Sequence, residues 1–423
     1  MNVLLLGGGG REHALAWRLS QSPLSQALFI APGNAGTSEF GTNLSLDPND
    51  FPALKAAVIE RKIGLVICGP EEPLVRGVQD FFKQDADLAH VRFIGPSAEA
   101  AKLEGSKAYA KEFMETYGIP TASYQKFTAT TLEEGLAYLD TCRTPIVLKA
   151  DGLAAGKGVV ILHDCGEAKE ELKAMLGGKF GAASEEVVIE EFLDGIEFSV
   201  FVLTDGESYR ILPVAKDYKR IGVGDTGPNT GGMGSVSHPP FVDADMMAKV
   251  EQQVILPTLK GIQDRQLDYK GFIFIGLISV EGEPYVIEYN CRMGDPETQS
   301  VMARLKSDFL QLCLETADGE LASAVVDIDD RQVATVVLVS GGYPGPYEKG
   351  KLILGLDEVS GSRVFHAGTK LNETGEVVTN GGRVLAVTSY GETFREALKT
   401  SYENARKIHF AGVNYRGDIG FDL

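Results

Sequence analysis

The first hundred residues alternate between short apolar runs and amphipathic segments, and this alternation constrains the fold more than any other feature of the chain. Met1–Leu6, Ala27–Ala31, Leu65–Cys68 and Val91–Ile94 have the composition of buried strands, whereas Arg11–Ser20 has the period of an amphipathic helix. Strands that alternate with helices predict a parallel, doubly wound sheet. Ligands of such sheets bind at the carboxyl ends of the strands, in the loops that follow them.

Three loops after these strands should lie at one edge of the sheet: Gly9–Arg11, Pro32–Thr37 and Gly69–Glu72. The first is not a dinucleotide-binding fingerprint, because its glycines lack the required spacing and no acid ends the second strand. Free N–H groups, a helix dipole and Arg11 suit a single phosphate, although a tight turn with a surface arginine is the alternative. We expect one sugar-phosphate pocket here, formed by Gly9, Gly10, Arg11, Asn34 and Glu71.

The middle of the chain carries a glycine-rich segment, Thr144–Leu162, whose pattern predicts a strand, a turn and a second strand. It is not a P-loop, because Asp151 replaces the first required glycine and Gly158 replaces the Ser or Thr after the lysine. A hairpin with Lys149 on one strand and Lys157 at its tip can fold over polyphosphate as a lid. The alternative is a solvated surface hairpin. Before it, Ser97 caps a helix, and Gly105–Tyr117 should continue that helix.

Two segments after the lid favour ligand contacts more weakly. In Glu185–Leu203 two apolar strands flank a linker, a place that suits adenine, with Glu197 able to accept from ribose hydroxyls. Asp217–Ser235 has neither helical nor strand period, and a polar loop of this length is uncommon unless it is functional or disordered. Lys219 and Arg220 in this loop could reach an anion.

The strand Pro284–Tyr289 leads into a segment typical of a metal site. Glu288 and Asn290 are two residues apart, so both side chains project from one face of the strand. Two hard oxygen ligands, completed by phosphate oxygens and water, are how Mg²⁺ is held at nucleotide sites. Arg292 could clamp an anion, and Asp295 follows in a sharp turn. The alternative is a strand end with exposed acids.

Composition excludes several classes of protein. The net charge of −19 weighs against a nucleic-acid partner, since phosphate backbones are bound by basic surfaces. Five cysteines without a CxxC pair favour a reduced, cytoplasmic location over disulfides or zinc. Without a basic N-terminal region or a long apolar run, neither a signal peptide nor a membrane span is expected. The last hundred residues predict a small α+β unit, with strands in Val333–Ser340 and Glu376–Ala386 and a helix in Thr393–Ile408.

Together, the lid, the linker and the Glu-x-Asn strand resemble the ATP-grasp superfamily. Within it, the chain resembles the glycinamide ribonucleotide synthetase (phosphoribosylamine–glycine ligase) family along nearly its whole length. The motifs that carry this resemblance are GGGGREHALAW (7–17), APGNAGT (31–37), GPEEPLV (69–75), LEGSKAYAKEF (103–113), KADGLAAGKGV (149–159), DTGPNTGGMG (225–234), NCRMGDPETQ (290–299) and FHAGTKL (365–371). Met293 replaces the usual Phe of the family, a soft apolar exchange that should preserve function. Many ATP-grasp enzymes resembled by this chain supply a further metal acid from the preceding strand, but Gly271–Ser279 contains no carboxylate, which weighs against a second metal position.

The resemblance implies a multidomain fold of α/β and α+β parts. Residues 1–102 would form a doubly wound substrate domain, residues 103–325 an ATP-grasp core with a lid at 122–191, and residues 326–423 an α+β C-terminal domain. The implied reaction joins glycine to 5-phosphoribosylamine with ATP, through a glycyl phosphate, in purine synthesis. The alternative is another ATP-grasp carboxylate–amine ligase or a carboxyphosphate-forming purine enzyme. A nucleotide-binding regulatory module without turnover is a third reading, against which the joint presence of Lys149, Glu288, Asn290 and Arg292 argues.

Roles for individual residues also follow from the resemblance. The ATP-binding residues would be Lys107, Lys149, Gly156, Lys157, Gly158, Glu190, Glu191, Phe192, Leu193 and Glu197. Glu288 and Asn290 would bind Mg²⁺, with Mn²⁺ as an alternative. Lys149, Arg292 and Asp295 would act in catalysis, and Lys219, Gly231, Gly294 and Asp295 would contact substrates. The expected partners are therefore small molecules, without nucleic acid or membrane, and the expected assembly is a monomer.

Overall fold

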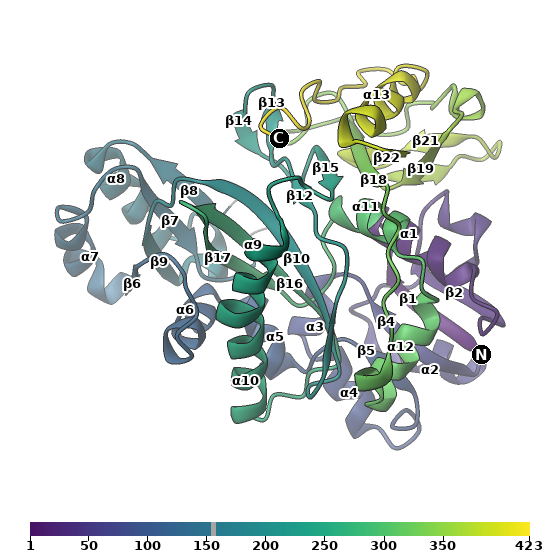
Figure 1. The fold of residues 1–423 in the computed structure, drawn as a ribbon, viewed down its shortest axis with the longest axis horizontal. Helices are drawn as coiled ribbons and strands as arrows, with labels where there is room; N and C mark the ends of the chain where they lie inside the picture. Colours follow the sequence, from purple (N-terminus) through teal and green to yellow (C-terminus); the bar gives the residue numbers. More distant parts are fainter. Residues whose placement is uncertain (154–157) are drawn as a thin grey trace.

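The structure, a computed structural model, describes residues 1–153 and 158–423. Four larger sheets and their helices form an N-terminal part, a lid, a central part and a C-terminal part (Figure 1). The lid, with α7 and α8, lies at the left of Figure 1, and the C-terminal part lies above the N-terminal sheet at the right. The predicted multidomain α/β and α+β architecture is confirmed.

The N-terminal sheet is parallel, as the alternation of strands and helices predicts. Its order is β3-β2-β1-β4-β5, with β1 in the centre. Along β1, Val3 and Leu5 enter one hydrophobic core and Leu4 and Leu6 enter another, because successive side chains of a strand point to opposite faces. The strands are β1 (Asn2–Gly7), β2 (Ala27–Pro32), β3 (Thr42–Asn43), β4 (Ile63–Cys68) and β5 (Arg92–Ile94), and the helices are α1 (Gly10–Ser20), α2 (Phe51–Glu60), α3 (Glu71–Val75), α4 (Val78–Gln84), α5 (Ala98–Gly105) and α6 (Lys107–Thr116).

The lid is an antiparallel sheet of order β6-β9-β7-β8 with a hydrophobic core of its own. It comprises β6 (Tyr124–Thr128), α7 (Leu132–Leu139), β7 (Ile146–Ala150), β8 (Val159–Leu162), α8 (Cys165–Leu176) and β9 (Glu186–Glu191). The predicted strand–turn–strand pattern of Thr144–Leu162 is confirmed by the pairing of β7 with β8. The tip of this hairpin, including Gly156 and Lys157, lies outside the described residues.

The central sheet is antiparallel, with the order β11-β10-β16-β17. Its elements are β10 (Ile196–Thr204), β11 (Tyr209–Ile211), α9 (Ala244–Val250), α10 (Leu256–Asp264), β16 (Gly271–Val280), β17 (Glu283–Asn290), α11 (Glu297–Arg304) and α12 (Phe309–Asp318). Glu281 and Gly282 join β16 to β17 and both have positive φ, the conformation that a tight hairpin turn requires. The register shifts by one residue so that Ile287 has no partner on β16. Such bulges are common beside active sites, where they redirect side chains.

The C-terminal sheet draws strands from two separated parts of the chain. Its order is β12-β15-β18-β22-β19, and β12 and β15 lie upstream of residue 326, the expected start of the C-terminal domain. The elements of this part are β12 (Lys216–Asp217), β13 (Arg220–Gly222), β14 (Thr226–Asn229), β15 (Gly234–Ser237), β18 (Gln332–Val339), β19 (Ser362–His366), β20 (Thr369–Leu371), β21 (Val377–Thr379), β22 (Arg383–Gly391) and α13 (Phe394–Ala405). Of these, β13 with β14 and β20 with β21 form two separate two-stranded sheets. The segment 216–237 thus links the central part to the C-terminal part.

Two expectations about local structure were wrong. Asp217–Ser235 is not a loop without strands: it contains β13 and β14 and parts of β12 and β15, strands too short for their period to show. Gly105–Tyr117 does not continue the preceding helix, because the chain leaves helical geometry at Ser106. The Ser106 hydroxyl accepts from the backbone N–H of Tyr109, so this residue caps a new helix, α6.

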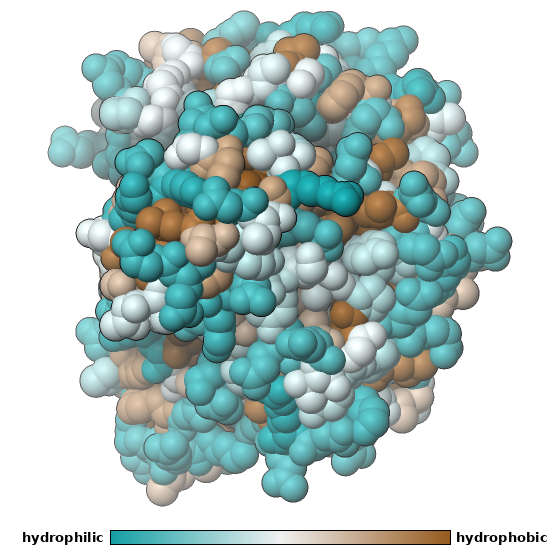
Figure 2. Space-filling view, turned by 90° about the vertical axis from the view of Figure 1, so that its left-hand side faces the viewer, coloured by the Kyte–Doolittle hydropathy of each residue, from teal (hydrophilic) through white to brown (hydrophobic). Residues whose placement is uncertain are grey.

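The surface shows no single large apolar area on the face drawn in Figure 2. Hydrophilic residues cover most of that face, and hydrophobic residues are scattered among them. Within residues 1–153 and 158–423, no helix combines the length and the apolar character needed to cross a membrane.

A buried histidine pair joins the N-terminal part to the C-terminal part. His13 on α1 and His366 on β19 are 2% and 7% exposed, and the backbone N–H of His366 donates to Nδ1 of His13 at 2.6 Å. Burial lowers the pKa of His13 to about 3, with a further contribution from His366, and burial lowers the pKa of His366 to about 4. Both imidazoles are therefore neutral in the folded protein at neutral pH.

This pair should make the folded protein acid-sensitive. A folded-state pKa below the unfolded value means that the unfolded chain binds more protons, so stability falls as pH drops below about 6.5. Between pH 7 and pH 5 each histidine should remove about 2 kcal/mol from the free energy of unfolding. His13→Asn keeps an acceptor for the His366 N–H and should reduce this pH dependence by about that amount, measured by chemical unfolding. The same substitution at exposed His90 is the control; an unchanged pH dependence in His13→Asn would contradict the interpretation.

Candidate active site

A cavity of about 770 Å³ lies between the lid, the central sheet, the N-terminal loops and the C-terminal sheet. Most of the residues expected to bind ATP, metal or substrate line it. They are Arg11, Glu71, Lys107, Lys149, Gly158, Glu190, Glu191, Phe192, Leu193, Glu197, Lys219, Gly231, Glu288, Asn290, Arg292, Gly294 and Asp295. Gly9, Gly10 and Asn34 are not among its lining residues. The folding of four distant chain segments onto one cavity is what makes this the candidate site.

On the lid side, two buried lysines share one carboxylate. Lys149 Nζ and Lys111 Nζ lie 2.8 and 3.3 Å from Glu190 Oε2. Burial lowers the pKa of Lys111 to about 8. The other oxygen, Glu190 Oε1, is buried and has no hydrogen-bond partner in the described part of the chain. A buried acceptor without a donor is costly, so this oxygen is suited to receive a hydrogen bond from a ligand.

Glu288 and Asn290 stand at the end of β17, as the sequence predicts, and both face the cavity. Gly276 lies opposite Glu288 on β16, where a Cβ would come within 3.0 Å of Glu288 Cγ, so the absent side chain makes room for the carboxylate. The unpaired Ile287 at the bulge leaves its carbonyl to Lys149 Nζ at 3.3 Å. The bulge therefore ties the lid lysine to the strand that carries the candidate metal ligands.

Lys219 lies between two acids of the cavity, 2.8 Å from Glu197 Oε2 and 3.9 Å from Glu288 Oε1. Burial opposes its charge, but Glu197, Asp217 and Glu288 together raise the pKa of Lys219 well above its usual value. Lys219 is therefore a permanent cation beside the candidate metal strand.

Arg292 does not continue along β17, which ends at Asn290, but turns toward the N-terminal part. Its Nη2 lies 2.8 Å from Glu104 Oε1 and its Nε lies 3.4 Å from Glu71 Oε2. Burial raises the pKa of Glu104 to about 7 although Arg292 opposes the shift. The Nε group makes no hydrogen bond of good geometry within the described residues, so its ion pair with Glu71 leaves it able to turn to an anion in the cavity.

The predicted convergence of the N-terminal loops is confirmed, but several of their polar groups already have partners. The Gly9 N–H donates to Glu12 Oε2 at 2.6 Å, and Arg11 Nε donates to Glu12 Oε1 at 2.5 Å. The Asn34 amide nitrogen donates to the carbonyls of Gly8, Gly9 and His366. Asn34 therefore holds the loops together, and Arg11 is the member of this group that lines the cavity.

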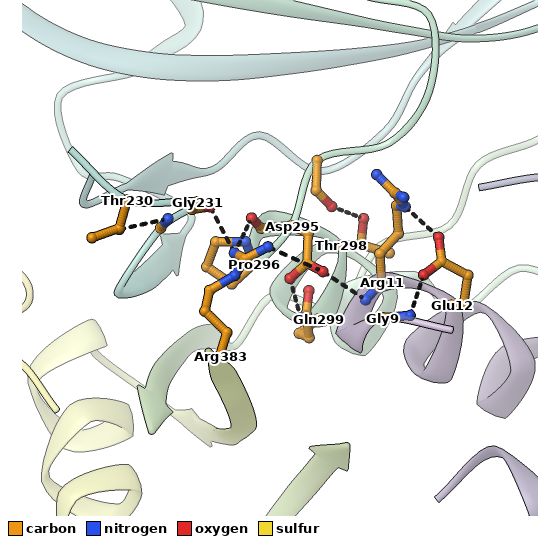
Figure 3. Close-up of polar contacts among 12 residues, drawn as sticks. Gly9, Arg11, Glu12, Thr230, Gly231, Asp295, Pro296, Thr298, Gln299 and Arg383 are labelled. Carbon is orange, nitrogen blue, oxygen red and sulfur yellow. Dashed lines mark hydrogen bonds and ion pairs between the residues drawn. The ribbon is translucent and has the colours of Figure 1, made fainter. Parts of the chain in front are cut away.

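Asp295 is the point where three parts of the molecule meet (Figure 3). Its carboxylate accepts from the Arg11 backbone N–H at 3.3 Å and from Gln299 Nε2 at 2.8 Å, and lies 3.5 Å from Arg383 Nη2. Arg383 Nη1 also donates to the carbonyls of Gly231 and Asp295. Burial opposes ionisation, but Arg383 and Arg11 together lower the pKa of Asp295. An ionised carboxylate with three donors is suited to orient neighbouring groups rather than to remove protons.

Eight charged residues that line the cavity were missed by sequence reasoning. They are Glu104, Lys111, Lys216, Asp217, Asp225, Glu297, Arg383 and Asp422. Glu104 and Lys111 lie in the 103–113 motif, and their positions among apolar helix residues were a usable signal. Asp217 and Glu297 adjoin residues that had been singled out. Arg383 gave no signal, because only the tertiary fold brings β22 to this cavity.

Comparison with known proteins agrees with this geometry along the whole chain. Residues 1–104 match the family model for the phosphoribosylglycinamide synthetase N domain, residues 105–298 match its ATP-grasp (A) domain and residues 333–422 match its C domain. Phosphoribosylamine–glycine ligases from Yersinia pestis and Vibrio vulnificus are 49% and 48% identical to this chain. Each match covers all of this chain and 98% of the relative. The crystal structure of the Thermotoga maritima phosphoribosylamine–glycine ligase is 37% identical, with a TM-score of 0.84, and the match covers 98% of this chain and 99% of that one.

Proposed function

The chain belongs to the phosphoribosylglycinamide synthetase family of ATP-dependent ligases, and we propose that it joins glycine to 5-phosphoribosylamine, forming glycinamide ribonucleotide, ADP and phosphate. The observation that carries this proposal is one continuous cavity. It brings the lid lysines, the Glu288–Asn290 strand end and the N-terminal loops together, so a nucleotide, a small acid and a sugar phosphate can meet there.

ATP lies between the lid and the central sheet. Lys107, Lys149 and the hairpin residues Gly156, Lys157 and Gly158 neutralise its phosphates, and the segment Glu190–Leu193 holds adenine, with Glu190 Oε1 accepting from the 6-amino group. Glu197 accepts from the ribose hydroxyls. Because Glu190 is fixed by two lysines, it can keep this orientation before the nucleotide arrives.

A divalent metal is required by ATP-grasp chemistry in general, and the residues present fit one. Glu288 and Asn290 offer one carboxylate and one amide oxygen, the hard donors that Mg²⁺ prefers, and phosphate oxygens and water would complete the shell. In residues 1–153 and 158–423, no cluster of three or more His, Cys, Asp or Glu could hold a metal unaided. We therefore propose Mg²⁺, with Mn²⁺ as an alternative, held jointly by the protein and the nucleotide. The metal would neutralise charge on the transferring phosphoryl group.

The chemistry needs no protein nucleophile. A glycine carboxylate oxygen attacks the γ-phosphorus, the bond to ADP breaks, and a glycyl phosphate forms. The amine of phosphoribosylamine then attacks the carbonyl carbon of the glycyl phosphate, and a C–N bond forms. The bond from this carbon to the phosphate oxygen breaks, and the nitrogen releases one proton. Lys149, Lys219 and Arg292 stabilise the developing charge, and Asp295 with Gly231 and Gly294 orients the reactants. Closure of the lid excludes water from the acyl phosphate.

Several further expectations remain proposals. We keep the boundaries 1–102, 103–325 with a lid at 122–191, and 326–423. The pairing of β12 and β15 with the C-terminal sheet adds that the second and third units share the segment 216–237. We also propose a cytoplasmic monomer whose partners are its small-molecule substrates.

Substrate dependence of ADP release tests the function against its alternative. ADP release should require glycine and freshly made phosphoribosylamine together. Release that responds to bicarbonate instead would favour a carboxyphosphate-forming enzyme. No release under any condition would contradict ligase activity altogether, and would leave a nucleotide-binding module.

Arg11→Ala should weaken phosphoribosylamine binding while ATP binding is unchanged. Arg11 lines the cavity at the N-terminal loops, and its guanidinium is the cation that the substrate phosphate would meet. Loss of a charge-assisted contact should raise the KM for phosphoribosylamine by about 10- to 100-fold. Steady-state kinetics with each substrate varied separately measure this. Equal losses for both substrates would contradict the assignment of these loops.

A further inference from the structure

The hairpin of β13 and β14 has little packing of its own, although it and its flanks line the cavity. The two strands form a separate two-stranded sheet, β14 is almost entirely exposed, and Val223 in the turn is 63% exposed. A two-stranded hairpin by itself is only marginally stable in water. The cavity residues that lie on this hairpin or beside it include Lys219, Arg220, Asp225, Asn229, Thr230 and Gly231. Contacts with the rest of the molecule must therefore hold these residues in place.

The central contact comes from Arg416, which is only 1% exposed. Its guanidinium pairs with Asp225 in the hairpin turn, and its Nη1 donates to the carbonyl of Arg220 at 3.2 Å. Its Nε donates to Asp418 Oδ1 at 2.6 Å, and Asp418 Oδ2 accepts from the backbone N–H of Gly224 at 2.7 Å. Burial opposes the charge of Arg416, but Asp418 and Asp225 together raise its pKa. Arg416 is therefore a permanent cation that joins both strands of the hairpin to Asp418.

A further contact from the same segment reaches the chain just before the hairpin. Asp422 Oδ1 accepts from the Tyr218 hydroxyl at 2.9 Å, and Asp422 Oδ2 lies 3.0 Å from Lys216 Nζ. Figure 1 shows the C-terminus beside β13 and β14, at the top of the view. The segment 416–422 therefore holds the segment 216–225 at both of its ends.

The turn of the hairpin has a backbone conformation that benefits from this support. Gly224 and Asp225 have φ values of 68° and 52°, in the left-handed region. A residue with a side chain is uncommon in this region and stays there when its surroundings fix it. The ion pair with Arg416 fixes the side chain of Asp225, and Asp418 fixes the N–H of Gly224. Both residues of the turn are thus held from the C-terminal part.

We propose that Arg416 is a positioning residue for the ligase reaction: with Asp418 and Asp422 it fixes the β13–β14 hairpin at the cavity, so that water is excluded from the acyl phosphate. This inference rests on the proposed function. In the part of the chain that the structure describes, Arg416 and Asp418 are not among the residues that line the cavity. Both therefore act through the hairpin and not on a substrate directly.

A displaced hairpin would expose the glycyl phosphate to water. The water oxygen would attack the carbonyl carbon, the bond from this carbon to the phosphate oxygen would break, and glycine, phosphate and one proton would be released. ATP would then be consumed without formation of the C–N bond. The ratio of ADP to glycinamide ribonucleotide therefore reports how well the hairpin excludes water.

Arg416→Lys tests the proposal, because lysine keeps the positive charge but cannot hold two carboxylates and a backbone carbonyl at once. Formation of glycinamide ribonucleotide should fall by about 10- to 100-fold, since small misplacements of positioning groups have effects of this size. ADP release should fall less, so the variant should release clearly more ADP than glycinamide ribonucleotide. The KM for ATP should stay close to that of the wild type, because the nucleotide lies between the lid and the central sheet.

A second variant and a matched control accompany this measurement. Asp418→Ala removes the acceptor of the Gly224 N–H and one partner of Arg416, so it should uncouple ADP release in the same way. Arg395 on α13 is exposed, and its Nη2 donates to the carbonyl of Leu423 at 2.9 Å. Arg395→Lys therefore makes the same chemical change beside the same segment, and should leave the ratio of ADP to glycinamide ribonucleotide unaltered.

A folded Arg416→Lys protein that releases equal amounts of ADP and glycinamide ribonucleotide would overturn the proposal, and Arg416 would then only stabilise the C-terminal part. If Arg416→Lys unfolds, the ratio measured for Asp418→Ala decides. Unfolding of both variants would also overturn the proposal, because the segment would then be needed for the fold itself. Failure of the proposed function has a different signature: the wild type would then show no ADP release that requires glycine and phosphoribosylamine.

Discussion

Glu288→Gln should lower turnover by at least about 100-fold while the protein remains folded, because several kcal/mol of charge stabilisation by the metal depends on this ligand. Glutamine keeps the size of the side chain but replaces a charged oxygen by an amide. The Glu288 carboxylate lies 3.9 Å from Lys219 Nζ, which is a long ion pair. Loss of the Glu288 charge should therefore cost little stability. Steady-state ADP release and thermal unfolding, measured together, separate the two effects.

The other end of the same strand supplies the control. Glu283 on β17 is exposed and pairs with Lys249 on the surface, so Glu283→Gln should leave turnover unaltered. Raising the Mg²⁺ concentration should partly restore Glu288→Gln and have no effect on the control. Near-normal activity of Glu288→Gln would show that the metal ligands lie elsewhere.

The second large effect is expected for Arg292→Lys, which should reduce kcat/KM for glycine by about 100- to 1000-fold. A loss of this size is typical when one preorganised hydrogen-bond donor to the charge of the transition state is removed. Lysine keeps the positive charge, but one ammonium cannot hold Glu104, approach Glu71 and donate to an anion in the cavity at once. Glu104 would also lose its close contact with the guanidinium, the interaction that keeps burial from raising the pKa of Glu104 further.

An exposed arginine provides the comparison for this variant. Arg92 makes two hydrogen bonds to Asp318 on the surface, so Arg92→Lys tests the same chemical change outside the cavity and should leave kcat/KM unaltered. If Arg292→Lys stayed within a few-fold of wild type, Arg292 would only link the N-terminal part to the core.

The features that could be predicted from the sequence are those with a local cause. The parallel sheet followed from apolar runs alternating with helices, and β16 and β17 followed from two long apolar strands around a short turn. The common orientation of Glu288 and Asn290 toward the cavity could be predicted because strand geometry puts residues two apart on one face. The lid hairpin followed from glycine between two strands.

What was missed depends on contacts between distant segments. β13 and β14 are too short to show a period. β12 pairs with β15, and β15 pairs with β18, so that Gly234 lies opposite Val336, far away in the sequence. Arg383 follows a glycine turn like many surface arginines, and only the tertiary fold aims it at Asp295. Asn34 was expected to contact substrate because its loop follows a strand at the edge of the sheet. Its amide nitrogen donates to the carbonyls of Gly8, Gly9 and His366, and its role toward the substrate stays a prediction. The strand, helix or loop that contains a polar residue was thus easier to predict than the contacts that its side chain makes.

The transfer of an oxygen atom from glycine to phosphate tests the central claim most directly. Glycine labelled with ¹⁸O in both carboxylate oxygens would be supplied with ATP and phosphoribosylamine, and the inorganic phosphate released would be analysed by mass. A glycyl phosphate intermediate predicts one labelled oxygen in every phosphate, because the oxygen that attacks the γ-phosphorus leaves with it. Phosphate without label, formed in a reaction that still consumes glycine and phosphoribosylamine, would contradict the account.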